Sequence, residues 1–202
     1  MSTRGRFIVL EGADGAGTTT QAQALSSWLE ARGATAHVTQ EPSGGPVGRL
    51  IREILRGEKP SEMGWQRLAL LFAADRLDHY EREIAPRLDE GEHVISDRYL
   101  LSSLVYQGLS LPLDWVEALN RHAPAPDVTL VLDVDADEAW ARQARRGGER
   151  ELYDERELQR TVCRRYRELA PRVDAIVVDG GGTVEVVTQR LVASIAPLLG
   201  DP

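Results

Sequence analysis

A glycine-rich turn near the amino end of the chain has the residue types that bind polyphosphate. The segment FIVLEGADGAGTTTQ follows the pattern G-x-x-x-x-G-K-[ST] at nearly every position. Glycines lack a Cβ, so backbone N–H groups can curl around an anion, and the helix that follows adds its positive N-terminal dipole. The hydroxyl of Thr19 stands where the pattern has a magnesium ligand. The predicted loop comprises Gly12, Ala13, Asp14, Gly15, Ala16, Gly17, Thr18, Thr19 and Thr20.

Thr18 occupies the position at which this pattern has its lysine. Lys59 is the single lysine among 24 lysines and arginines, and it lies far away in the polar stretch RGEKPSE. A cation on the β- and γ-phosphates must therefore come from elsewhere, or the loop binds nucleotide weakly or not at all. The sequence leaves both hypotheses open.

A second group of candidate residues lies at the end of the third apolar run, where the sequence reads Ser96, Asp97, Arg98, Tyr99. A carboxylate at a strand end beside a phosphate loop is placed like the acidic residue that holds Mg²⁺ in phosphoryl-transfer enzymes. Thr19 and Asp97 are therefore the candidate metal ligands. Arg98 is expected to point into the same cleft and to act with Asp97 as a catalytic residue.

The helical segment LLFAADRLDHY places Phe72 and Arg76 four residues apart, on one helix face. An aromatic ring one turn from a guanidinium can stack on a base and bind the phosphate of the same small molecule. The simpler alternative is a core phenylalanine beside a surface arginine. Gln107 has an amide suited to the edge of a base, although an exposed glutamine is the commoner explanation for any single one.

An arginine-rich segment, ARQARRGGERELYDERELQR, surrounds Gly147 and Gly148 and predicts a lid at about 142–155. Arginines carried by a mobile lid can stabilise a migrating phosphoryl group. Arg146 and Arg150 are the candidates for this role. The alternative is a solvated charge run in which arginines pair with neighbouring glutamates and aspartates.

Five apolar, mostly β-branched runs alternate with segments of helical period, which predicts an α/β fold with a five-stranded parallel sheet flanked by helices. The runs are 7–11, 36–40, 93–97, 128–134 and 175–179. Helices are expected at about 18–32, 61–89, 112–122, 135–146, 153–170 and 183–198, with another bearing Arg49 and Arg52. Each strand ends in polar or acidic residues, so the chemistry should lie along one sheet edge.

The length of 202 residues and the 42% hydrophobic content fit one domain spanning residues 1–202. The chain has one cysteine, Cys163, and the apolar runs are only strand-sized, so we expect a cytoplasmic protein without disulfides or membrane spans. A formal charge of −8 argues against broad nucleic-acid binding, which needs a basic face.

Taken in order, these motifs resemble the thymidylate kinase family from Arg6 to about Leu198. The loop EGADGAGTTTQ resembles that family's EG-x-D/E-GAGKTTQ, and EPSGGPVGRLIR resembles its REPSGTPLGE-x-IR. LLFAADRLDH, SDRYLLSSLVYQG and PDVTLVLDVDADEAWAR resemble later segments of the family. Thr18 in place of lysine and Gln40 in place of arginine are the two departures.

The resemblance implies a P-loop nucleoside monophosphate kinase that transfers the γ-phosphoryl group of ATP to dTMP with Mg²⁺, usually as a homodimer. It implies that Phe72 stacks on thymine and that Gln107 contacts the base edge. The implied substrate-binding set is Asp14, Glu41, Pro42, Phe72, Arg76, Arg98, Ser103 and Gln107, with Arg150 as the lid arginine and Arg146 as its alternate. Two other functions remain open: a nucleotide-binding module without turnover, and a kinase for another pyrimidine monophosphate such as dUMP.

Overall fold

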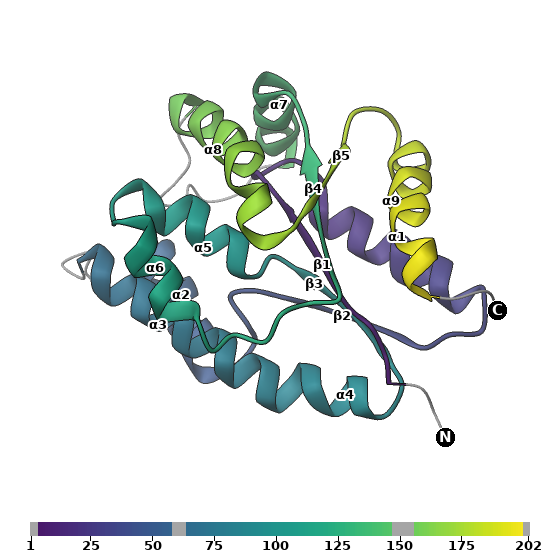
Figure 1. The fold of residues 1–202 in the computed structure, drawn as a ribbon. Helices are drawn as coiled ribbons and strands as arrows, with labels where there is room; N and C mark the ends of the chain where they lie inside the picture. Colours follow the sequence, from purple (N-terminus) through teal and green to yellow (C-terminus); the bar gives the residue numbers. More distant parts are fainter. Residues whose placement is uncertain (1–3, 58–63, 147–155, 200–202) are drawn as a thin grey trace.

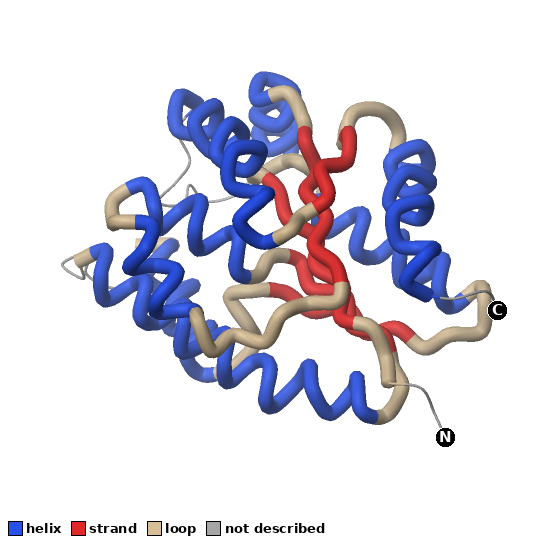
Figure 2. The backbone as a smooth tube through the Cα atoms, viewed as in Figure 1, coloured by secondary structure: helices blue, strands red, loops and turns tan. Residues whose placement is uncertain are grey.

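Five parallel strands form the centre of the molecule (Figures 1 and 2). The computed structural model describes residues 4–57, 64–146 and 156–199, except for the side chains of 144–146. The strands are β1 (Phe7–Gly12), β2 (Ala36–Gln40), β3 (His93–Asp97), β4 (Val128–Asp133) and β5 (Ile176–Asp179). They lie in the order β2-β3-β1-β4-β5, and every neighbouring pair is parallel. This confirms the predicted sheet.

Helices cover both faces of this sheet. In the described residues they are α1 (Thr18–Glu30), α2 (Pro46–Leu55), α3 (Trp65–His79), α4 (Ala85–Asp89), α5 (Leu100–Tyr106), α6 (Leu113–Asn120), α7 (Ala136–Arg146), α8 (Arg156–Leu169) and α9 (Val184–Leu199). Helices α1 and α9 lie together on one side, whereas α3, α4, α5, α6 and α8 lie on the other (Figure 1).

The alternation of side chains along β1 explains the two-sided packing. Ile8 and Leu10 point to the face that α1 and α9 cover, where they meet Leu25 and Leu191. Phe7 and Val9 belong to the apolar cluster on the opposite face. Successive residues of a strand point to opposite faces, so a central parallel strand must be apolar throughout.

The segment expected as one helix over 61–89 is helical without interruption from Trp65 to Asp89, where α3 is followed by a π-helical turn (Tyr80–Ile84) and then by α4. Residues 58–63 lie outside the described part. Helix α5 is an addition to the helices expected from the sequence. Most of its side chains are buried, so it lacks the polar face by which a helix is identified from sequence. Within the described residues, no helix is both long and apolar enough to span a membrane.

The carboxyl ends of the central strands meet at one edge of the sheet. The backbone N–H of Glu41, just after β2, donates to the carbonyl of Asp97 at the end of β3 (3.0 Å). The N–H of Arg98 donates to the carbonyl of Leu10 in β1 (2.8 Å). The polar residues that follow these strands are therefore neighbours, as predicted.

Candidate active site

A cavity of about 240 Å³ opens at this edge of the sheet. It is lined by the phosphate loop and α1 at one end, by α2 and α3, and by the segment from β3 to α5. The sequence-predicted residues in its wall are Ala13, Asp14, Gly15, Gly17, Thr18, Thr19, Glu41, Pro42, Phe72, Arg76, Asp97, Arg98, Ser103 and Gln107. Gly12, Ala16 and Thr20, also predicted, belong to the loop and helix but do not line the cavity.

The glycines of the loop have the conformations that the motif requires. Gly15 and Gly17 have φ angles of 84° and 97°, which L side chains rarely adopt. Gly17 is the N-cap residue of α1. Because glycine has no side chain, it provides no side-chain acceptor for the first N–H groups of α1. These N–H groups and the helix dipole make this end of the cavity suitable for an anion.

Thr18, at the lysine position, begins α1 and is 6% exposed. Its Cγ2 atom would lie only 3.2 Å from a Cβ placed on Gly12. The residue therefore packs inside the loop while still lining the cavity.

Thr19 and Asp97 meet as expected for a magnesium site. The Thr19 hydroxyl donates to Oδ2 of Asp97 over 2.5 Å, and Asp97 is 7% exposed. Among the described residues, the other carboxylate oxygen, Oδ1, is buried and has no hydrogen-bond partner. A hydroxyl and a carboxylate with an unused oxygen suit Mg²⁺, which prefers oxygen ligands and takes most of the others from phosphates and water. The donor set therefore fits the implied metal.

Arg98 is held beside the loop in a strained conformation. Its φ of 75° lies in the left-handed region that most residues avoid. Nη1 donates to the carbonyl of Gly12 (2.9 Å) and to the hydroxyl of Tyr166 (2.8 Å), and Nη2 donates to Oδ1 of Asp14 (2.5 Å). Burial opposes the charge of Arg98, but Tyr106, Tyr166, Asp14 and Asp97 together raise its pKa well above the ordinary value. The guanidinium is therefore a fixed cation at the centre of the site.

Glu11, near the end of β1, binds the segment that directly follows Arg98. Its carboxylate accepts from the N–H groups of Tyr99 (2.9 Å) and Ser102 (3.1 Å) and from the hydroxyl of Ser102 (2.6 Å). Burial raises the pKa of Glu11, while the hydrogen bonds from Ser102 and the charge of Arg98 act in the opposite direction. Glu11 thus fixes the start of α5 to β1.

Arg76 is 1% exposed, so the alternative of a surface arginine is wrong. Its Nε and Nη2 donate to Oε2 of Glu41 at 3.0 and 2.8 Å. Nη2 also reaches the hydroxyl of Ser103 and the carbonyl of Tyr99, both at 3.0 Å. Glu41 and Ser103, which the resemblance places against the substrate, therefore bind Arg76 in this structure.

The loop after β2 is fastened by two consecutive residues of α3. Arg76 holds Glu41, while the preceding residue, Asp75, accepts from the N–H of Ser43 (2.7 Å) and from its hydroxyl (2.6 Å). Pro42 lies between the two anchored residues and lines the cavity.

Another part of the cavity wall suits a flat, partly apolar group. Phe72 is partly buried and lines the wall, as do Tyr106 and Gln107. Gln107 is 3% exposed, and its Oε1 has no hydrogen-bond partner among the described residues. The interpretation of Gln107 as an exposed surface residue is therefore wrong. The hydroxyl of Tyr106 donates to Oδ2 of Asp14 (3.1 Å), which connects this part of the cavity wall to the phosphate loop.

Helix α8 reaches the site from a distant part of the chain, a contribution that the sequence did not indicate. The hydroxyl of Tyr166 contacts both Arg98 and Ser102 at 2.8 Å. Gln159, 2% exposed, donates from Nε2 to the backbone carbonyl of Asp14. Neither residue stands in a recognisable motif, and their side chains meet the loop only through long-range packing.

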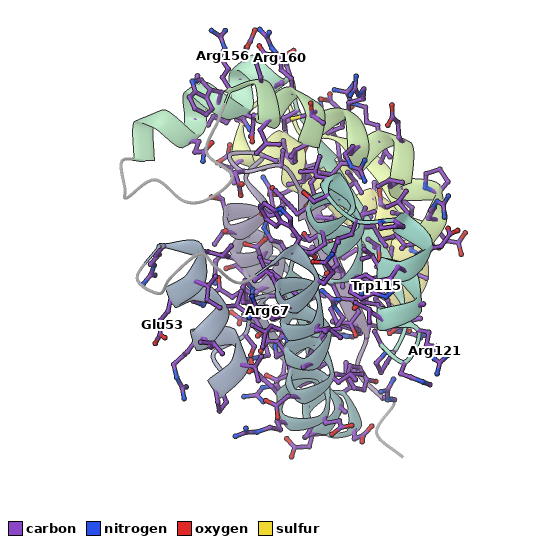
Figure 3. All side chains as sticks on the ribbon, turned by 90° about the vertical axis from the view of Figure 1, so that its left-hand side faces the viewer. Glu53, Arg67, Trp115, Arg121, Arg156 and Arg160 are labelled. Atoms are coloured by element: carbon purple, nitrogen blue, oxygen red, sulfur yellow. The ribbon has the colours of Figure 1, made fainter. Side chains whose placement is uncertain are left out.

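The described part of the arginine-rich segment forms surface ion pairs. Arg156 and Arg160 lie close together at the edge of the molecule (Figure 3), and both bind Asp137, at 2.9 and 3.2 Å. Arg142 binds Glu138 at 2.5 Å, while its Nη1 lies 3.5 Å from the carbonyl of Ala16 in the loop. The side chain of Arg146 and all of 147–155, including Arg150 and the two glycines, lie outside the described residues.

Comparison with known proteins extends over nearly the whole chain. The thymidylate kinase family model matches residues 10–191. A probable thymidylate kinase of Pyrococcus abyssi is 41% identical over 197 residues, 95% of this chain and 96% of the relative. One from Thermococcus kodakarensis is 41% identical over 203 residues, covering 96% and 99%. A putative thymidylate kinase of Treponema pallidum is 39% identical over 194 residues, 92% of each chain.

Proposed function

Because the chain belongs to the thymidylate kinase family, we propose that it phosphorylates dTMP to dTDP, with ATP as the donor and Mg²⁺ as the cofactor. One observation carries the proposal furthest. One cavity is lined both by the phosphate loop with the Thr19–Asp97 pair and by Phe72 and Gln107. A donor triphosphate and a base-bearing acceptor would meet between them.

At the donor end, the loop N–H groups would bind the ATP phosphates, and Thr19 with Asp97 would hold Mg²⁺. Mg²⁺ held there would supply positive charge against the negative charge that develops during transfer. The partnerless Oδ1 of Asp97 supports this assignment, because a buried carboxylate oxygen is costly to leave without a donor or a cation.

At the acceptor end, Phe72 would stack on the thymine and Gln107 would hydrogen-bond to its edge. Asp14 would accept from the 3′-hydroxyl of the deoxyribose. Arg76 and Arg98 would meet the acceptor phosphate or the transferring group; both line the cavity, Arg76 fully buried and Arg98 partly buried. Glu41 and Ser103 would act mainly through Arg76, to which both are hydrogen-bonded.

The reaction is an in-line displacement at the γ-phosphorus. A phosphate oxygen of dTMP forms the new P–O bond while the bond to the β-phosphate oxygen breaks and ADP leaves. The bound dTMP phosphate is already ionised, so the enzyme supplies position and positive charge rather than a base. Arg98, whose Nη1 donates to the carbonyl of Gly12 at 2.9 Å, provides such a positive charge beside the loop.

The position of Thr18 means that arginines must provide the charge of the absent lysine. Arg98 and Arg142 both contact the backbone of the loop. Arg146 and Arg150 remain part of the proposal on sequence grounds. Arg150→Ala should lower turnover at least tenfold, a lower bound because arginines that stabilise phosphoryl transfer contribute about 10³- to 10⁵-fold. Equal turnover of the two proteins would remove Arg150 from the mechanism.

The test of the function is an acceptor panel. Purified protein with ATP and Mg²⁺ is given dTMP, dUMP, dCMP and dGMP, and the acceptors are ranked by kcat/KM. We expect dTMP to rank first. Asp97→Asn, prepared identically, controls for kinases carried over from the expression host. A higher rank for dUMP would change the acceptor, and dTMP binding without dTDP formation would indicate a nucleotide-binding module.

We also propose a homodimer, a single domain and a cytoplasmic location. A homodimer is supported by the exposed apolar side chains of Trp65 (38%) and Leu70 (49%) on α3, and light scattering would test it. A single domain over residues 1–202 predicts one cooperative unfolding transition. The cytoplasmic location rests on the composition of the chain.

A further inference from the structure

The hydroxyl of Tyr166, on α8, lies among buried polar groups beside the phosphate loop. The side chain is almost fully buried, and its ring belongs to the apolar cluster that α5 and α8 share. The hydroxyl oxygen lies 2.8 Å from Nη1 of Arg98, 2.8 Å from Oγ of Ser102 and 3.4 Å from Oε2 of Glu11. Burial raises the pKa of Tyr166, so the hydroxyl keeps its proton and needs an acceptor for it.

The hydrogen bonds of this group run in one direction. The buried carboxylate of Glu11 accepts through Oε2 from the hydroxyl of Ser102 at 2.6 Å. Because Ser102 gives its proton to Glu11, its oxygen can only accept from Tyr166. The Tyr166 proton therefore points toward Ser102 or Glu11, which leaves the lone pairs of the Tyr166 oxygen for an N–H of Arg98. Glu11 thus orients the tyrosine hydroxyl as an acceptor for the guanidinium.

Arg98 is held by part of its guanidinium only. Nη1 donates to the carbonyl of Gly12 (2.9 Å) and to Tyr166 (2.8 Å), and it lies 3.2 Å from Oγ of Ser102. Nη2 donates to Asp14 (2.5 Å). Within the described part of the chain, Nε and the second N–H of Nη2 have no protein acceptor. The side chain lines the cavity and is 19% exposed, so these N–H groups are available to an anion bound there.

We propose that Tyr166 is a positioning residue whose hydroxyl, oriented by Glu11 through Ser102, fixes Nη1 of Arg98 and so presents its other N–H groups to a phosphate oxygen. This inference rests on the proposed function and adds a residue to it. Tyr166 does not line the cavity, so it reaches the reacting groups only through Arg98. Loss of its hydroxyl must therefore lower turnover without weakening the binding of base and sugar.

Two variants disturb this arrangement at nearly constant volume. Tyr166→Phe removes only the hydroxyl. In Glu11→Gln the amide oxygen can keep the two backbone N–H groups that Oε1 accepts, so an NH₂ donor takes the place of Oε2 and reverses the hydrogen bonds. We expect kcat/KM for dTMP to fall about tenfold in each, as for one hydrogen bond to a charged group. The double variant should stay within about twofold of the weaker single variant, because both changes break the same contact with Arg98.

Thymidine, which lacks the phosphate, separates positioning of Arg98 from a general loosening of the site. Its affinity, measured by calorimetry, should stay within about twofold of the wild-type value in both variants. Tyr80→Phe is the matched control. The Tyr80 hydroxyl also accepts from an arginine, Arg4 (3.1 Å), but Tyr80 does not line the cavity. Its kcat/KM should stay within about twofold of the wild-type value.

A wild-type kcat/KM in Tyr166→Phe would overturn the role of Tyr166 and leave the kinase proposal standing. A parallel fall in thymidine affinity would overturn it too, because Tyr166 would then only pack the fold, and so would an equal loss of turnover in Tyr80→Phe. Should Tyr166→Phe not fold, Glu11→Gln carries the same comparison of turnover with thymidine affinity. A double variant whose loss is the product of the two single losses would contradict the link through Glu11. A wild-type protein that phosphorylates no acceptor would instead overturn the proposed function.

Discussion

The hydroxyl of Thr19 lies 2.5 Å from Oδ2 of Asp97, although 78 residues separate them in the chain. Thr19 is the second residue of α1, and Asp97 is the last residue of β3. Because β1 and β3 are adjacent and parallel, the helix that follows β1 starts beside the end of β3. The phosphate loop and the acidic strand end therefore form one oxygen-rich site.

Replacing Thr19 by valine should impair magnesium-dependent turnover. Valine has nearly the shape of threonine but no oxygen, so the proposed metal ligand and the hydrogen bond to Asp97 are both lost. We expect kcat to fall on the order of 10- to 100-fold, with a higher Mg²⁺ concentration needed for half-maximal rate. Thr19→Ser keeps the hydroxyl and should retain most activity. Steady-state rates over a Mg²⁺ titration would give kcat and the Mg²⁺ requirement of each variant. An unchanged Mg²⁺ requirement in Thr19→Val would argue against metal ligation by Thr19.

Restoring a lysine at position 18 should change turnover only modestly. Thr18 is packed inside the loop, and Arg98 and Arg142 already contact the loop backbone. An ammonium added to a site with compensating guanidinium groups gains little further attraction. We expect kcat for Thr18→Lys within about tenfold of the wild-type value, a difference of about 1.4 kcal/mol or less in activation free energy. A gain of several decades would instead show that the natural loop is impaired.

Local sequence signals predicted the parts of this molecule that depend on local structure. The five apolar runs predicted the bounds of the strands almost residue by residue, because a central parallel strand must be apolar on both faces. The glycine spacing identified the phosphate loop, since Gly15 and Gly17 need positive φ. Pairing Thr19 with Asp97 needed only the topology that those strands imply.

The contacts among side chains from distant segments could not be predicted in the same way. The resemblance implies that Glu41 and Ser103 contact the substrate, and the structure adds that both bind Arg76. Tyr166 and Gln159 approach the site from α8, and their positions depend on how that helix packs over the sheet. Such contacts depend on packing between elements, which one sequence does not reveal.

Gln107 should contribute to the binding of the acceptor's base. Its buried Oε1 has no hydrogen-bond partner among the described residues, so a bound base is expected to provide one. Gln107→Leu keeps much of the volume and removes both amide groups. We expect kcat/KM for dTMP to fall about tenfold, as for the loss of one neutral hydrogen bond. The KM for ATP should not change. A dTMP value equal to that of the wild-type enzyme would mean that Gln107 does not contact the base.

Cys163 should react slowly with thiol reagents in the native protein. The residue is 5% exposed on α8, and burial raises its pKa to about 11. At pH 8 only about a thousandth of the thiol is then ionised, compared with roughly a quarter for a free cysteine. Labelling with an aromatic disulfide should therefore be at least 100-fold slower than in guanidinium chloride. Rapid labelling of the folded protein would show that α8 opens readily.

Acidification should weaken the fold partly through His93. Its Nδ1 accepts the backbone N–H of Arg6 at 3.0 Å, which requires an unprotonated nitrogen. Burial and the charge of Arg6 lower the pKa of His93 in the folded protein. The unfolded chain therefore takes up a proton at higher pH than the folded chain, so this contribution to stability is present above the ordinary histidine pKa near 6.5 and is lost as the pH falls through the lower folded pKa. His93→Asn keeps an acceptor but cannot titrate. Urea unfolding at pH 7.5 and 5.0 should show a smaller loss of unfolding free energy in the variant than in the wild-type protein, and equal losses would exclude His93 as a source of the pH dependence.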